Sequence, residues 1–251
     1  MDGCWNPWHG CQKYSEGCLN CYVYRRDATV GRESSEVART AEFDLPVKKR
    51  RDGGFKLEAG SHVYACMTSD FFLPDADAWR EGAWRMIRAR PDVSFTIITK
   101  RILRMADCLP ADWGEGYENV EIALTCENQR RADERMDAFL SLPIRRRFIV
   151  CEPMLGPIDL GRRLDGRVRV VVAGGESGPN ARELRYEWVL SLREQCREAG
   201  VGFYFKQTGA NFVKDGLRYR IERRLQMAQA KKAKIDLMCV SSPAQPGYIR
   251  N

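Results

Sequence analysis

The sequence predicts an α/β fold, a partial (β/α) barrel of about six or seven parallel strands, and two patterns carry the prediction. After residue 60, largely apolar runs of about five or six residues alternate with longer amphipathic stretches. Gly, Pro, Asp or Asn bounds the runs, as expected of strands that are covered on both faces and joined by helices. The runs span residues 62–67, 94–99, 119–125, 147–151, 168–173 and 202–206.

The stretches between the runs have the spacing of helices. They span residues 77–90, 129–142 and 185–199. Around the third, apolar residues recur every four positions from Leu184 to Cys196, and Gly200 supplies a C-terminal stop. A short strand near residues 5–7 brings the strand count to about seven, which fits a partial barrel better than a complete eightfold one. A doubly wound open sheet is the alternative, because periodicity does not separate the two.

Composition indicates a globular chain. Hydrophobic residues make up 44% and charged residues 30% of the 251 residues. We expect a single domain over residues 1–240, followed by a loosely ordered tail at 241–251 that holds two prolines and a glycine. The chain has no apolar run near the ~20 residues that cross a bilayer and no secretory signal pattern, so we expect a cytoplasmic protein without membrane partners.

Polar residues directly follow the predicted strands. Because the carboxyl ends of parallel strands share one edge of a sheet, a polar site lined from several strands explains these residues together. Helix capping is the alternative for Ser69, Asp70 and Asn128. The residues concerned are Ser69, Asp70, Lys100, Arg101, Thr125, Glu127, Glu152, Glu176, Lys206 and Gln207.

Four of the ten cysteines fall within the first 21 residues, and three of them, Cys11, Cys18 and Cys21, have the spacing C-x6-C-x2-C. In a reducing compartment such thiols are metal ligands more often than disulfides. Three cysteines with one open position suit a [4Fe–4S] cluster. Structural zinc is the rival interpretation, in which Cys4 or His9 completes a set of four ligands.

The segment from Cys4 to Tyr22 resembles the opening of the phage Gp37/Gp68-like (DUF5131) family, whose members are uncharacterised domains placed near radical S-adenosylmethionine enzymes. The likeness extends in order over roughly residues 4–235. The family usually has Thr at Cys4 and Ser at Cys151, and the cysteine spacing differs from the common C-x3-C-x2-C of radical enzymes. The matching motifs are 67–70, 95–101, 151–156, 174–179 and 205–207.

The resemblance implies a radical S-adenosylmethionine enzyme in which Cys11, Cys18 and Cys21 hold the cluster. The cluster then cleaves S-adenosylmethionine to a 5′-deoxyadenosyl radical, with an electron donor such as flavodoxin or ferredoxin as a partner. Candidate contacts of S-adenosylmethionine are Ser69, Asp70 and Lys100 for its amino acid part, Thr125 and Glu127 for the ribose, and Gly174 and Gly175 for the adenosine. Glu176 is a further candidate, for the cofactor or the substrate.

Cys151, at the end of a predicted strand, is the candidate hydrogen-atom donor, because spore photoproduct lyase-like enzymes use a cysteine in this way. A buried inert cysteine is the alternative interpretation. Cys66 and Cys126 also lie near strand ends.

Charge patterning bears on the substrate. The net charge is +7, and between Arg218 and Lys234 seven basic residues face one acid, Glu222; a second basic run occupies residues 48–51. With the resemblance, these runs lead us to expect action on nucleic acid, most simply DNA repair or base modification, with Tyr204, Phe205 or Tyr219 stacking on a base. Solvated basic faces with a small-molecule or peptide substrate are the first alternative. A zinc-stabilised nucleic-acid-binding protein without catalysis is the second.

Overall fold

A computed structural model describes residues 2–238 of the chain. They form a mixed α/β fold whose largest sheet has seven strands in the order β1-β4-β5-β6-β7-β8-β10. This order follows the chain without reversal, as in (β/α) barrels, whereas a doubly wound sheet needs a point where the order reverses. The predicted α/β class and the count of about seven strands are therefore confirmed, and the doubly wound alternative is wrong. The tail expected at 241–251 lies outside the described residues.

The chain groups into two compact units. The first comprises Met1–Tyr14, Val23–Ala123 and Ser141–Arg146, and the second comprises Ser15–Tyr22, Leu124–Leu140 and Arg147–Asn251. The strand β6 (Val120–Thr125) is divided, with residues 120–123 in the first unit and 124–125 in the second. The single domain expected over residues 1–240 stays a prediction.

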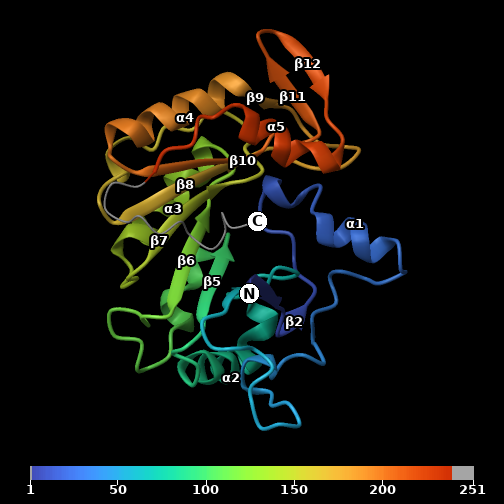
Figure 1. Cartoon of the computed structure of the whole chain (residues 1–251), viewed down its shortest axis with the longest axis vertical. Helices are drawn as coiled ribbons and strands as arrows, with labels where there is room; N and C mark the ends of the chain where they lie inside the picture. The colour runs from blue at the N-terminus through green and yellow to red at the C-terminus, as the bar shows by residue number, and fades with distance from the viewer. Residues whose placement is uncertain (1, 239–251) are drawn as a thin grey trace. The chain divides into compact units, whose positions relative to one another are not determined.

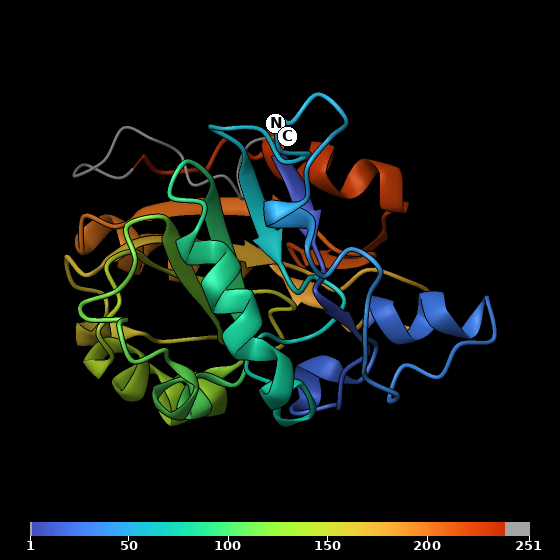
Figure 2. The same ribbon diagram turned by 90° about the horizontal axis from the view of Figure 1, so that it is seen from below.

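The first unit contains β1 (Asp2–Trp5), β4 (His62–Ala65) and β5 (Ser94–Thr99), which pair in parallel. The helix α2 (Asp77–Arg88), seen in Figure 2, buries Trp84 and Ile87. Aromatic rings fill the core, since Trp5 meets Phe95 edge-on at 5.8 Å between ring centroids, a geometry that stabilises aromatic pairs. Smaller elements are β2 (Trp8–His9), β3 (Ala38–Arg39) and most of α1 (Tyr22–Ala28).

The second unit contains β7 (Arg147–Cys151), β8 (Val168–Gly174) and β10 (Gly202–Gln207), again parallel. Every residue of β7 is buried, as expected of a strand covered on both faces. The helices are α3 (Gln129–Ser141), α4 (Tyr186–Glu198) and α5 (Gln226–Lys232). A separate sheet in the order β12-β11-β9 is formed by β9 (Leu184–Arg185), β11 (Asn211–Lys214) and β12 (Leu217–Arg220).

None of the helices in the described part of the chain has the length and apolar character that crossing a bilayer requires. Short 3-10 helices occur at Glu16–Cys18, Leu45–Val47, Pro74–Ala76, Ile102–Arg104, Ala106–Cys108, Gly161–Arg163 and Arg223–Leu225.

Candidate metal centre

The three predicted cluster ligands are cysteines of intermediate exposure. Cys11 follows β2 and belongs to the first unit, whereas Cys18 and Cys21 belong to the second. The region from residue 10 to residue 21 is called the cysteine segment below. In residues 2–238 the structure groups no three His, Cys, Asp or Glu side chains as ligands of a metal ion.

Cys18 and Cys21 lie on one helical turn. The 3-10 helix ends at Cys18, Leu19 has right-handed helical angles (φ −56°, ψ −51°), and the backbone N–H of Cys21 donates to the carbonyl of Cys18 at 3.4 Å. Residues three apart on a helical turn present their side chains on the same side. The C-x2-C pair therefore spans one hydrogen-bonded turn.

In the first unit, the residues that follow β4 hold the start of the cysteine segment. The hydroxyl of Ser69 donates to the carbonyl of Gly10, whose own N–H donates to the carbonyl of Thr68 at 3.3 Å. The N–H of Cys11 donates to the carbonyl of Ser34 at 2.8 Å. Ser69, predicted as a cofactor contact, thus donates its hydroxyl hydrogen bond to Gly10, the residue before the predicted cluster ligand Cys11.

Arg101, which follows β5, holds the next residues of the segment. Its guanidinium donates to the carbonyl of Gln12 at 2.7 Å and lies 4.5 Å from the ring centroid of Tyr14. Only 7% of Arg101 is exposed. Planar stacking together with a hydrogen bond suits arginine better than lysine, because the guanidinium is flat and always charged.

Asp70, another predicted cofactor contact, organises the strand ends of the first unit. Its carboxylate accepts hydrogen bonds from the Thr99 hydroxyl at 2.8 Å, the N–H of Phe72 at 3.0 Å and the N–H of Lys100 at 3.1 Å. Asp70 is 7% exposed. These contacts give it a structural task, and its role and that of Lys100 as cofactor contacts stay predictions.

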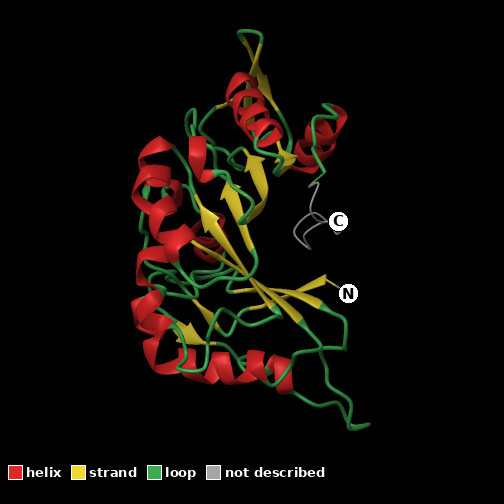
Figure 3. Cartoon of the chain, turned by 90° about the vertical axis from the view of Figure 1, so that its left-hand side faces the viewer, coloured by secondary structure: helices red, strands yellow, loops and turns green. Residues whose placement is uncertain are grey.

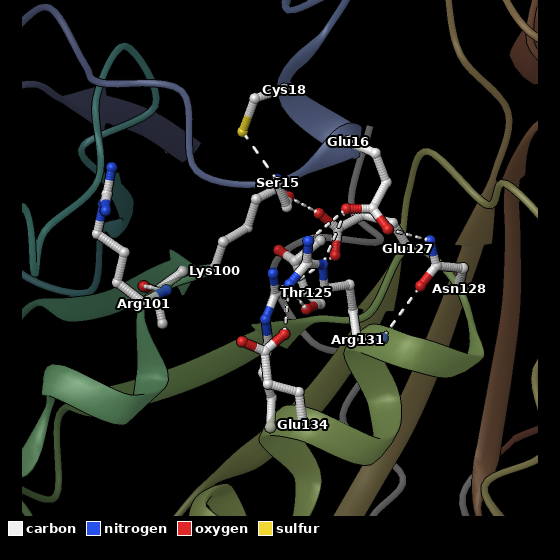
Figure 4. A network of polar contacts seen from close by, with 12 residues as sticks. Ser15, Glu16, Cys18, Lys100, Arg101, Thr125, Glu127, Asn128, Arg131 and Glu134 are labelled. Carbon is white, nitrogen blue, oxygen red and sulfur yellow. Dashed lines mark hydrogen bonds and ion pairs between the residues drawn. The ribbon is translucent and has the colours of Figure 1, made fainter.

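In the second unit, Glu127 anchors the segment from the end of β6 (Figure 4). Its carboxylate accepts a hydrogen bond from the hydroxyl of Ser15. It also forms an ion pair with Arg135, whose Nη1 atom lies 2.6 Å from Oε2 of Glu127. The side chains of Glu127 and Arg135 are both 0% exposed. Because such a pair is out of water, each charge depends on the other for its stability.

Gly17 packs directly against the same carboxylate. A Cβ atom placed on Gly17 would lie 2.5 Å from the Cγ and Oε1 atoms of Glu127, inside van der Waals contact. A side chain at position 17 therefore requires the buried Glu127 to move. This close approach explains why a glycine directly precedes Cys18.

Glu16 forms a further ion pair drawn in Figure 4, with Arg131. Its carboxylate accepts from the side-chain amide of Asn128 at 2.6 Å and from the guanidinium of Arg131 at 2.6 Å. The hydrogen bonds from Asn128 and then Arg131 lower the pKa of Glu16 to about 2. Asn128 also caps α3, because its side-chain oxygen accepts from the N–H of Arg131 at 3.0 Å.

Glu176, which follows β8, anchors the far end of the segment. It accepts from the amide of Asn20 at 2.9 Å and from two nitrogens of Arg182 at 2.5 and 2.9 Å. Burial raises the pKa of Glu176, but the hydrogen bonds from Arg182 and Asn20 outweigh it, so that the pKa lies below its usual range. Arg182 also donates to the carbonyl of Glu16 at 2.8 Å.

The remaining predicted contacts of the adenosine part are buried in the second unit. The carbonyl of Thr125 accepts from Arg135 at 2.8 Å. A Cβ on Gly175 would meet the carbonyl of Thr208 at 2.4 Å, so the chain itself occupies that side of the glycine pair. On Gly174 a Cβ would meet the carboxylate of Glu152 at 3.1 Å. Cofactor contacts at Thr125, Glu127, Gly174, Gly175 and Glu176 stay predictions.

Cys151 is 0% exposed in β7. Burial, and then the neighbouring thiols of Cys126 and Cys196, raise its pKa well above the usual value. A protonated, buried thiol fits the alternative of an inert core cysteine, and hydrogen-atom donation by Cys151 stays a prediction.

Several residues of the site were not among the predicted ligands. They are anchors of the cysteine segment, and three of them, Ser15, Gly17 and Asn20, stand inside the motif itself, so a pattern of small and polar residues beside the cysteines was the available signal. Arginines that pair with buried carboxylates gave no sequence signal of their own. The residues missed are Ser15, Gly17, Asn20, Arg131, Arg135 and Arg182.

A family model described as a protein of unknown function, DUF5131, matches residues 1–238. The chain belongs to this family. The resemblance seen in the sequence is therefore confirmed at the level of the family. Neither a search among curated proteins nor one among solved structures found a match.

Proposed function

We propose that this DUF5131 protein is a radical S-adenosylmethionine enzyme that acts on nucleic acid, with a [4Fe–4S] cluster on Cys11, Cys18 and Cys21. One observation carries the proposal. Within each unit, polar side chains at the carboxyl ends of parallel strands are bonded to the cysteine segment: Ser69 and Arg101 in the first, Glu127 and Glu176 in the second. That edge of a parallel sheet is where α/β proteins place their chemistry.

The donor set fits an iron–sulfur cluster with one open position. Three cysteines lie within an eleven-residue stretch, and Cys18 and Cys21 share one hydrogen-bonded turn. The rival zinc site needs a fourth protein ligand. His9, one of the two candidates, already bonds through its Nε2 atom to the Oδ2 atom of Asp27 at 2.8 Å. This contact leaves Nδ1 for a metal, as in many metal-bound histidines, so it does not separate zinc from the open cluster.

The reduced cluster would supply cleavage of S-adenosylmethionine to a 5′-deoxyadenosyl radical, with the electron coming from flavodoxin or ferredoxin in a reducing cytoplasm. The chain's own contribution is positional. Glu127 and Glu176 hold the side chains of Ser15 and Asn20, on either side of Cys18. Ser69 and Arg101 hold the backbone carbonyls on either side of Cys11. A site held in advance by buried contacts loses little energy to rearrangement when its ligand binds.

The proposed substrate is a base in DNA, repaired or modified after it leaves the stack. The cation-rich region near the C-terminal end of the described chain supports a polyanionic substrate, and it favours nucleic acid over a small molecule or peptide.

Product analysis tests the reaction itself. Protein purified and reconstituted without oxygen is incubated with dithionite and S-adenosylmethionine, and 5′-deoxyadenosine is measured by mass spectrometry. We expect the product from the native chain and at least a 100-fold loss in Cys18→Ala. The matched control Cys196→Ala removes a buried thiol on α4 and should retain activity. A chain that binds one zinc ion and forms no 5′-deoxyadenosine would mean that the proposal is wrong.

A further inference from the structure

The positive charge of the chain is concentrated in one region. Residues 211–234 contain eight lysines and arginines against two acids, Asp215 and Glu222, a net charge of +6, whereas the whole chain carries +7. All other residues together are thus nearly neutral. A local excess of this size creates a field that attracts polyanions, which an evenly mixed surface does not.

A projecting hairpin forms the first part of this region. β11 and β12 pair antiparallel, with Lys214 opposite Leu217, and Asp215 and Gly216 form the two-residue turn with positive φ angles of 51° and 75°. An Asp-Gly pair with both φ angles positive is the turn that matches the twist of a hairpin. β12 is the outer strand of its sheet, and all four of its residues are exposed. Figures 1 and 3 show the hairpin extending beyond the rest of the second unit.

The two faces of β12 differ in chemistry, because alternate residues of a strand point to opposite sides. Tyr219 lies opposite Phe212, whose buried ring packs 5.8 Å from Tyr186. Tyr219 itself is 43% exposed, on the same face as Phe212. Arg218 and Arg220, its neighbours in the strand, point to the opposite face, so β12 carries an aromatic ring on one side and two guanidiniums on the other. Proteins that bind single-stranded nucleic acid combine cations for the phosphates with exposed rings on which bases stack.

The region is set apart by the number of its cations, because its ion pairing is mixed, as elsewhere in the second unit. Among the exposed arginines outside it, Arg197 pairs with Glu194 and Arg167 with Asp165, whereas Arg130 and Arg162 form no ion pair within residues 2–238. Inside it, Arg220, Lys231 and Lys232 form no ion pair with a described residue, although the charge of Lys231 acts on the carboxyl group of Asp236. The remaining arginines of the region do have contacts: Arg218 with Glu183, Arg223 with Gln207 and Arg224 with Glu222.

The base of the surface is firmly attached to the second unit. The carbonyl of Gln226, at the start of α5, accepts from the N–H of Thr208 at 3.2 Å, next to the end of β10. Gln226 is 1% exposed. Lys231 and Lys232 in the last turn of α5 are exposed, so the cations stand on an ordered support.

We infer that the hairpin β11–β12 together with α5 is the surface that binds the nucleic acid strand, in a single-stranded stretch. Tyr219 stacks on an unpaired base, and Arg220, Lys231 and Lys232 neutralise phosphates. The inference deepens the proposed function, whose substrate class it adopts. It concerns binding alone, which needs neither the cluster nor S-adenosylmethionine.

Fluorescence anisotropy with a labelled 20-nucleotide strand at several salt concentrations tests the phosphate contacts. The variant R220Q/K231Q/K232Q should weaken binding at least 10-fold and lower the slope of log K against log salt by about 2, since each contact contributes about 0.7 for single strands. The matched control R130Q/R162Q/R197Q removes the same charge from exposed positions of the second unit outside residues 211–234, and should change affinity less than 3-fold. Equal effects of the two variants would overturn the inference.

The stacking role has its own test. Tyr219→Ala should weaken binding to the single strand about 10-fold and leave duplex binding within 2-fold, and Tyr219→Phe should restore it, because every base stacks on an aromatic ring. DNA and RNA strands are compared to identify the sugar. Stronger binding to duplex, or to vesicles of anionic lipid, than to either strand would overturn the inference. If the chain binds single-stranded nucleic acid but makes no 5′-deoxyadenosine, the inferred binding surface stands and the proposed radical chemistry is wrong.

Discussion

The two halves of the cysteine segment are anchored by different kinds of contact. Residues 10–14, in the first unit, are bonded mainly through their backbone, to the hydroxyl of Ser69, the carbonyl of Ser34 and the guanidinium of Arg101. Residues 15–20, in the second unit, are bonded to the buried carboxylates of Glu127 and Glu176. The first half is therefore held at its backbone carbonyl and N–H groups. The second is held by carboxylates and the arginines that pair with them.

This difference indicates where the segment is vulnerable. A hydrogen bond to a backbone carbonyl contributes about 1 kcal/mol from a neutral donor such as Ser69, and about 1.5–3 kcal/mol from a charged one such as Arg101. A buried ion pair is another matter, because removing one partner leaves an uncompensated charge out of water, at a cost of about 3–5 kcal/mol. The Cys18 half should therefore respond far more strongly than the Cys11 half to single substitutions.

The largest effect is expected for Glu127→Gln. It keeps the shape of the side chain but leaves the fully buried Arg135 without its carboxylate, so we expect a loss of about 3 kcal/mol in the free energy of unfolding, measured in urea. Glu134→Gln is the control, because its pair with Arg131 is 34% exposed at the carboxylate and should cost less than about 1 kcal/mol. Equal stability of the two variants would show that the buried ion pair is not what makes residues 15–20 more sensitive to substitution than residues 10–14.

Gly17→Ala should have the next largest effect. The added methyl group meets Glu127 at 2.5 Å, and displacing a buried, paired carboxylate should cost about 1–3 kcal/mol. The variant should also lose bound iron, because the displaced residue directly precedes Cys18. Gly166→Ala, whose Cβ meets nothing within 4 Å, is the control and should be close to neutral. If Gly17→Ala matches this control in stability and iron content, the close packing does not hold the segment.

The smallest effect is expected from acid. The pKa of Glu16 is lowered to about 2 in the folded chain, so the stability it contributes is complete above the unfolded value of about 4.5 and is lost as pH falls toward 2. Its carboxylate is 35% exposed, which limits the contribution to less than about 1 kcal/mol. Glu16→Gln should flatten the pH dependence of thermal stability in this window, and Glu118→Gln, 83% exposed, should leave it unchanged. A steeper curve in Glu16→Gln would contradict the assignment.

Regular elements were predictable because their apolar runs are long and periodic. The strand expected at 94–99 is found at Ser94–Thr99, and that expected at 147–151 is found at Arg147–Cys151. The helix expected at 129–142 is found at Gln129–Ser141. The hairpin was missed although Asp215–Gly216 is a strong turn signal, and α1 was missed because its seven residues are too few to show a period.

The site was predictable only as far as residue types at strand ends. Ser69, Glu127 and Glu176 were expected to follow strands, and the structure shows them there in contact with the cysteine segment, while their role as cofactor contacts stays a prediction. Their partners were not, because Asn20 meets Glu176 across 156 residues of sequence and Ser15 meets Glu127 across 112. Contacts of that separation are set by the packing of the whole unit, and local patterns carry no information about them.

The most direct test of the central claim is iron and sulfide analysis of protein purified without oxygen, combined with electron paramagnetic resonance after reduction. The account predicts about four irons and four sulfides per chain, with a spectrum that shifts when S-adenosylmethionine is added, and loss of both in Cys11→Ala, Cys18→Ala and Cys21→Ala. Retention of the shift in Cys4→Ala would agree with an open position on the cluster. One zinc per chain without iron, or a cluster spectrum that S-adenosylmethionine leaves unchanged, would contradict the account.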